Sequence, residues 1–192
     1  MEHLYRIGTV LFTMMILFSV QSFHTAGNAA GTGPQEYQLS MDNIQETNIE
    51  SIFFLHAIEA CHANIHLSRL AIQKAHSPYM KDIASTLELE HKSWLHELTL
   101  LAHKNGFYVP AGMNQGDKIF MSFLNKQPGK EFDRQWTAIL IDKHDSFISE
   151  YDRYASKKSL HTSVKQWIEA NLPHLRAHQD RLLMFEQSMQ FE

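Results

Sequence analysis

The sequence predicts an all-α protein, an up-down-up-down four-helix bundle with a short extra helix in its middle link. Four long segments repeat their apolar residues at the 3.6-residue period of a helix, and no segment alternates as a strand would. The joints within the first and the last pair of segments are short, so each pair should form an antiparallel hairpin. Two such hairpins joined by a longer connection make a bundle.

The first two helices are expected over residues 45–75 and 78–105. The first carries an apolar stripe that ends where His-Ser-Pro, residues 76–78, breaks the pattern. Pro78 suits the first turn of the second helix, because the missing N–H has no partner there in any case. Gly106 suits a C-terminal cap, so both ends of the second helix carry a signal.

The second half of the chain predicts a link and two more helices. The link at 107–129 contains a short apolar piece at 119–124, which we expect to form a small helix across one end of the bundle. The third long helix is expected over 130–156 and the fourth over 160–187. Pro173 lies inside the fourth helix and is expected to kink or split it, because proline cannot donate a helical hydrogen bond.

Composition excludes several classes of protein. Of 192 residues, 44% are apolar and 20% are charged, which is typical of one globular domain with a packed core. The formal charge is −4 and no basic run occurs, so nucleic acid is not an expected partner. Cys61 is the single cysteine, and no internal disulfide can form. The 13 histidines are the one compositional hint of chemistry.

The N-terminus is predicted to be a signal peptide over residues 1–29. A single arginine precedes an apolar run at 7–23, and small residues follow it up to the expected cleavage point. A retained anchor is the alternative, because the run is near the lower limit of spanning length. Residues 30–44 should form a flexible lead to a bundle over 45–190. Without the signal peptide no membrane span is expected, and the protein should be exported to the periplasm or outer membrane of a bacterium.

Four polar residues interrupt the apolar stripes near the middle of the helices. They are Asn64, His91, His144 and His178, one from each predicted helix. We therefore predict a polar layer inside the core. A buried polar side chain without a partner costs about 1–3 kcal/mol, so the layer should be internally hydrogen-bonded, hydrated, or bound to a ligand or metal.

Metal binding is the sharper interpretation of this layer. The candidate ligands are His91, His144, His178, Glu88 and His174. Glu88 precedes His91 at the Glu-x-x-His spacing of di-iron and di-manganese bundles, and His174 lies one helical turn from His178. Imidazole ligands suit a divalent transition metal such as Zn, Fe or Cu. Asp133 is a further candidate for the layer, although a first-turn carboxylate is also favoured by the helix dipole.

Two observations weigh against redox chemistry of the di-iron kind. Such sites need glutamates from two helices and two Glu-x-x-His pairs, but Ile141 and Leu175 stand three residues before His144 and His178. The alternative to metal binding is a hydrated polar layer that fixes helix register.

A second polar group on the first helix is expected to be solvated rather than metal-binding. It consists of Glu59, His62 and His66.

Four stretches together resemble a known family. They are FFLHAIEACHANIHLSRLAIQKA, LELEHKSWLHELTLLAHKNGFYVP, EFDRQWTAILIDKHDSFISEYDRYA and NLPHLRAHQDRLL. In this order they resemble a bacterial ferritin-like family, the domain of unknown function 4142 family, whose members are often described as exported or outer-membrane proteins. The family pattern is matched at His91, Phe132, Asp133, His144, Leu172, Pro173 and His178. Asn64 departs from it, because the family typically has Glu there.

The resemblance implies a ferritin-like fold and export, and it supplies no activity. We therefore expect an exported ferritin-like bundle with a non-catalytic role, in binding or in envelope stress, rather than an enzyme. The alternative function is a metal-binding or metal-dependent redox protein that uses the central histidine layer. A homo-oligomer or an envelope partner is a further expectation.

Overall fold

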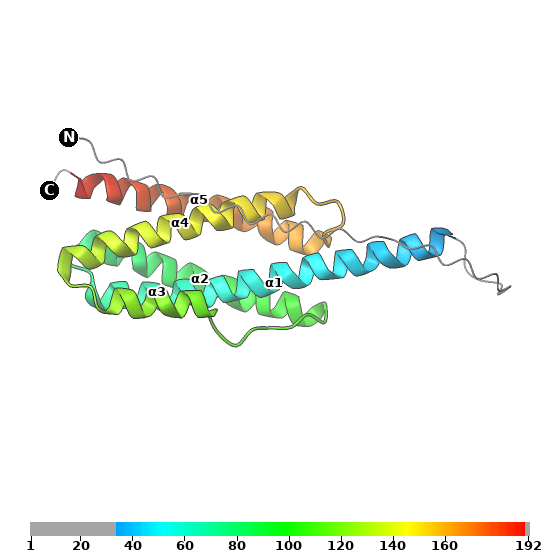
Figure 1. Ribbon diagram of the computed structural model, residues 1–192. Coiled ribbons are helices and arrows are strands. Elements are labelled where there is room, and N and C mark those ends of the chain that lie inside the picture. The colour runs from blue at the N-terminus through cyan, green and yellow to red at the C-terminus, as the bar shows by residue number, and fades with distance from the viewer. Residues whose placement is uncertain (1–33, 191–192) are drawn as a thin grey trace, which may run out of the picture.

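The computed structural model describes the backbone of residues 34–190 and the side chains of residues 49–190. The signal peptide expected at 1–29 lies outside this part of the chain. The described residues form helices and no strand, as the sequence predicts. The helices are α1 (Pro34–Lys74), α2 (Pro78–Lys104), α3 (Gln115–Asn125), α4 (Gly129–Ala155) and α5 (Thr162–Met189), shown in Figure 1. None of them is both long and apolar enough to cross a membrane.

Helix α1 is longer than expected. It begins at Pro34, so residues 34–44, expected to form a flexible lead, are helical. The local sequence accounts for this difference. Proline is tolerated in the first turn of a helix, and the residues that follow include good helix formers and no glycine.

The ends of α2 follow the local signals in the sequence. Pro78 occupies the first turn after Ser77, and Gly106 has a positive φ of 72° just beyond the helix. The N–H of Phe107 then bonds to the carbonyl of Ala102 at 2.9 Å and closes the C-terminal turn. Helix α3 begins earlier than the expected residues 119–124, because the side chain of Asn114 accepts a hydrogen bond from the N–H of Asp117 at 2.9 Å.

Pro173 does not split the last helix. Helix α5 runs through it from Thr162 to Met189. Of the two expected effects, a kink or a split, the split was wrong, because buried residues on both sides of the proline anchor one continuous helix against the bundle. Ile168 lies before Pro173, and Leu175 and His178 lie after it.

The directions of the helices correct one detail of the expected topology. Helices α1 and α2 form one antiparallel hairpin and α4 and α5 form the other, as the short joints predict (Figure 1). Helices α2 and α4, however, run in the same direction. The link and α3 lead the chain back along the outside of α1 and α4 before α4 begins. The four long helices therefore do not alternate strictly, and one long crossover of this kind is typical of ferritin-like folds.

Asp133 links the first turns of α4 to the joint between α1 and α2. Its carboxylate accepts hydrogen bonds from the backbone N–H groups of His76 and Ser77, at 2.9 and 2.8 Å. The side chain is only 3% exposed. Asp133 therefore holds the start of α4 against the turn between α1 and α2. Its expected place in the central polar layer was wrong, because the turn amides, which have no partner within a helix, attract the carboxylate to the end of the bundle.

We expect Asp133→Asn to lower the free energy of unfolding by about 1–3 kcal/mol. The amide offers one oxygen where the carboxylate offers two, so an NH₂ group would face a backbone N–H. Urea denaturation measures the change. Asp142→Asn is the matched control, because Asp142 is exposed on the same helix. Equal losses in the two variants would contradict this role for Asp133.

Candidate metal centre

A polar layer divides the core into two apolar clusters. One cluster extends to Cys61, Trp94, Ile148 and Leu175. The other begins at Leu67, Leu87, Leu140 and Leu182. Between these residues, each long helix contributes one buried polar side chain, and the four are Asn64, His91, His144 and His178. The layer expected from the helical period is therefore present, with one residue from each helix.

Three histidines of the layer meet. Among the side chains that the structure describes, His91, His144 and His178 form the one group of three potential metal ligands whose ligand atoms all lie within 4.8 Å of one another. The ring centroids are 5.7 to 6.2 Å apart. The three side chains, from α2, α4 and α5, are 2%, 0% and 4% exposed. We call them the histidine triad.

Backbone carbonyls orient two of these rings. The Nδ1 atom of His91 lies 2.9 Å from the carbonyl oxygen of Leu87, and Nδ1 of His144 lies 2.7 Å from that of Leu140. A carbonyl only accepts, so each Nδ1 carries the proton and donates. Each Nε2 is then left with a free lone pair. Histidines that bind metals are commonly oriented in this way, through a hydrogen bond from the other ring nitrogen.

Several polar atoms in the core have no hydrogen-bond partner. In the triad they are Nε2 of His144 and both ring nitrogens of His178, although Nε2 of His178 lies 3.2 Å from Oε2 of Glu90 without the geometry of a hydrogen bond. Oδ1 of Asn64 and Oγ of Ser68 on α1 are in the same condition. The amide of Asn64 is satisfied on one side only, because Nδ2 donates to the carbonyl of Ala60 at 2.9 Å. Because buried polar groups are nearly always paired, these atoms indicate a ligand or water within the layer.

The triad is electrically neutral near pH 7. Burial, assisted by the nearby charge of Lys143, lowers the pKa of His144 to about 4. Burial, followed by the neighbouring His144 and His174, lowers the pKa of His178 to about 3. Burial and the other two members also hold the pKa of His91 well below its usual range. Because a metal binds the unprotonated imidazole, the core keeps all three rings in the form that binds.

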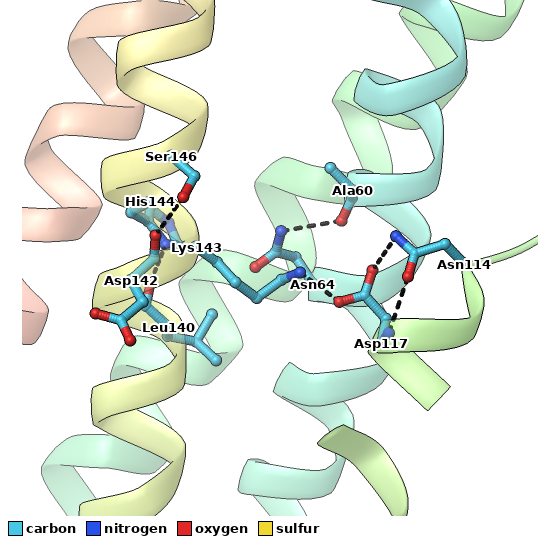
Figure 2. Close-up of polar contacts among 9 residues, drawn as sticks. All are labelled: Ala60, Asn64, Asn114, Asp117, Leu140, Asp142, Lys143, His144 and Ser146. Carbon is cyan, nitrogen blue, oxygen red and sulfur yellow. Dashed lines mark hydrogen bonds and ion pairs between the residues drawn. The ribbon is translucent and has the colours of Figure 1, made fainter. Parts of the chain in front are cut away.

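A buried ion pair holds α3 beside the triad. Lys143, next to His144 in the chain, reaches from α4 to the carboxylate of Asp117 on α3, as Figure 2 shows. Asp117 is 2% exposed and also accepts a hydrogen bond from Nδ2 of Asn114 at 2.9 Å. Burying this pair costs desolvation, which the additional hydrogen bonds offset. The sequence analysis missed this pair, because no local pattern indicates that residues 117 and 143 meet.

Glu88 is not placed with the triad. Its carboxylate pairs with Arg69 and Lys92, at 2.8 and 2.6 Å, and these cations lower its pKa. The carboxylate that contacts the triad belongs to Glu90, which the sequence analysis overlooked. Oε2 of Glu90 lies 3.2 Å from Nε2 of His178. The Glu-x-x-His spacing indicated Glu88 as the ligand, whereas the contact of Glu90 with His178 depends on how α2 packs against α5.

His174 lies at the surface beside the triad rather than within it. Its side chain is 59% exposed, and Nδ1 lies 3.3 Å from the same Oε2 of Glu90. The second polar group, Glu59, His62 and His66, does not gather into a cluster of metal-ligand atoms among the described side chains. It remains partly or fully exposed on α1, as expected.

Acid should destabilise the metal-free protein. A histidine in the unfolded chain has a pKa of about 6.5. Below that pH the unfolded chain binds protons, whereas the buried histidines of the folded triad stay neutral. Stability should therefore fall as pH drops from about 6.5 towards 4, with His144 contributing on the order of 3 kcal/mol. Urea denaturation at a series of pH values, with a chelator present, measures this slope.

His144→Gln should reduce the slope, because His91 and His178 still contribute, whereas the same change at the exposed His103 should leave it unchanged. An identical slope in His144→Gln and the parent protein would contradict the buried neutral state of His144.

The comparisons with known proteins give a family and no activity. No curated protein and no solved structure matches the chain. A family model described as a domain of unknown function, DUF4142, matches residues 41–184. This match spans all four residues of the polar layer and most of the chain, and the protein therefore belongs to the DUF4142 family.

Proposed function

We propose that this protein is a metal-binding helical bundle of the bacterial envelope, and that the histidine triad holds one divalent transition-metal ion. The observation that carries the proposal is the convergence of three buried imidazoles whose ligand atoms lie within 4.8 Å of one another. Two of these rings have Nδ1 bound to a backbone carbonyl, which leaves Nε2 to bind the ion. Three neutral imidazoles suit Zn, Cu or Fe.

The spacing of the triad fits such an ion after a small contraction. A tetrahedral zinc ion with Zn–N bonds of about 2.0–2.1 Å holds its nitrogens roughly 3.4 Å apart. The most distant pair in the triad would therefore approach by up to roughly 1.4 Å. Rotations of the side chains would supply this change, and the Nδ1 hydrogen bonds of His91 and His144 and the Trp94 ring packed on His91 limit how far the rings can turn.

The burial of the triad supports binding rather than catalysis. None of its three side chains is more than 4% exposed, so a substrate would not reach a bound ion without opening the bundle. Asn64 also supplies an uncharged amide where the family typically has a carboxylate. The donor set is therefore unlike the carboxylate-rich sites that activate oxygen at two iron ions.

The competing explanation is a hydrated polar layer that fixes the register of the helices. Water would satisfy Nε2 of His144 and Oδ1 of Asn64 as readily as a ligand would. Both explanations expect loss of stability when a histidine is removed. Only the metal proposal expects a stoichiometric ion that disappears with the same histidine.

Export to the envelope is the cellular part of the proposal. It is supported by the signal-peptide pattern of residues 1–29. A protein of this kind would hold metal outside the cytoplasm, in a binding or stress-protective role. Membrane and periplasmic fractions of the native host, probed for the protein with residues 1–29 removed, test this location.

We expect the protein, purified without a histidine tag, to bind one ion per chain. Elemental analysis and titration of the metal-free protein with Zn²⁺, Co²⁺ or Cu²⁺ measure the stoichiometry. His91→Ala and His144→Ala should each abolish stoichiometric binding, because two imidazoles cannot complete the site. At a free-ion concentration of about 100 times Kd, binding should stabilise the parent protein by about 2.7 kcal/mol and the variants by far less.

His96→Ala is the matched control, because His96 is exposed on α2. It should bind as the parent does. Circular dichroism verifies that the triad variants remain folded. A folded parent protein that binds no ion would eliminate the metal proposal and leave the hydrated layer.

A further inference from the structure

One carboxylate oxygen links the surface to the triad. Oε2 of Glu90 on α2 lies 3.2 Å from Nε2 of the buried His178 and 3.3 Å from Nδ1 of the exposed His174. The two histidines lie one turn apart on α5. The seam between α2 and α5 therefore carries three potential ligand groups in a row, from solvent to core.

Exposure decreases along this row. The side chain of His174 is 59% exposed, that of Glu90 is 30% exposed and that of His178 is 4% exposed. Along the bundle axis, the triad lies between the two apolar clusters of the core. Trp94 also packs on the triad, with ring centroids 4.7 Å from His91 and 5.6 Å from His178. The polar seam at Glu90 thus presents an ion with ligand groups that reach solvent, whereas Asn64 on α1 is fully buried.

The negative charge of Glu90 can compensate part of the charge of a divalent ion. Three neutral imidazoles leave both charges of a divalent ion uncompensated, and an uncompensated buried charge is costly. The positive charge of Lys143 is already paired with Asp117. Glu90 is ion-paired with no lysine or arginine among the described contacts, and its oxygen contacts only the two imidazoles of α5. A carboxylate in this position attracts a cation and replaces part of its water shell.

We propose that Glu90 and His174 form the access site that captures a divalent transition-metal ion from solvent and passes it to the triad. This inference rests on the proposed function of the triad. His174 and Glu90 bind the hydrated ion first. The ion then exchanges His174 for His178 at the shared Oε2 and moves inward to His91 and His144. An access site lowers the free-energy barrier to movement of the ion between solvent and the triad. It therefore speeds loading and release by the same factor, and Kd stays nearly unchanged.

Stopped-flow mixing of the metal-free, full-length mature protein with Co²⁺ tests this route. The visible absorption of bound Co²⁺ reports loading, and transfer to excess chelator reports release. We expect Glu90→Gln and His174→Ala each to slow loading about tenfold, which corresponds to one charge-assisted contact. Release should slow by a similar factor. The stoichiometry should remain one ion per chain.

Matched controls accompany both variants. Glu169→Gln removes an exposed carboxylate from α5, and His96→Ala removes an exposed imidazole from α2. Neither should change the rates. The double variant Glu90→Gln/His174→Ala should be slowed by less than the product of the single effects, because both residues act on the ion at the same position.

The outcomes separate the two proposals. Loading rates equal to those of the parent in both single variants would overturn the access route while leaving the triad as the binding site. A raised Kd with faster release in Glu90→Gln would also overturn it, and would make Glu90 a fourth ligand. If the parent binds no Co²⁺, Zn²⁺ or Cu²⁺, both proposals fail. If His91→Ala and His144→Ala each lose binding while Glu90→Gln and His174→Ala keep it, the triad is the binding site whatever the loading rates are.

Discussion

The need to satisfy polar atoms inside an apolar core is the constraint on which this structure depends. Each long helix brings one such residue to the same level, and the apolar contacts divide into one cluster on either side of it. Sliding one helix along its axis would move its polar residue out of this level and against hydrocarbon, which is costly for an unpaired polar group. Several buried nitrogens and oxygens in or next to the layer nevertheless have no hydrogen-bond partner among the described residues.

The chemistry of the layer follows from its depth. Burial keeps the imidazoles uncharged, and the carbonyls of Leu87 and Leu140 fix the proton on Nδ1 of His91 and His144. The α-helix supplies these carbonyls at no additional cost, since each lies four residues before its histidine. A site of neutral nitrogen donors results, surrounded by aromatic and aliphatic side chains. Such a site suits tight retention of an ion better than turnover of a substrate.

The crossover decides what surrounds the layer. Because α3 runs back along α1 and α4, it covers their outer side, and the Lys143–Asp117 pair fastens it beside His144. Among the described helices, none covers the seam between α2 and α5 as α3 covers α1 and α4 (Figure 1). There Glu90 and His174 stand between solvent and His178. Asp133 meanwhile ties the start of α4 to the first hairpin and thus fixes where the returning chain must join the bundle.

The sequence by itself determined the helices, the two hairpins, the family and the level at which polar residues enter the core. These features are local or periodic: a stripe at the helical period, a proline at a helix start, a glycine at a helix end. Only the tertiary structure decided the parallel course of α2 and α4, the place of Asp133 at the bundle end and the exchange of Glu88 for Glu90 beside the triad. Each of these depends on contacts between helices distant in sequence. Glu88 and Glu90 lie two residues apart on α2 and therefore face different sides of that helix. The packing of α1 against one side brings Arg69 to Glu88, and the packing of α5 against the other brings His174 and His178 to Glu90.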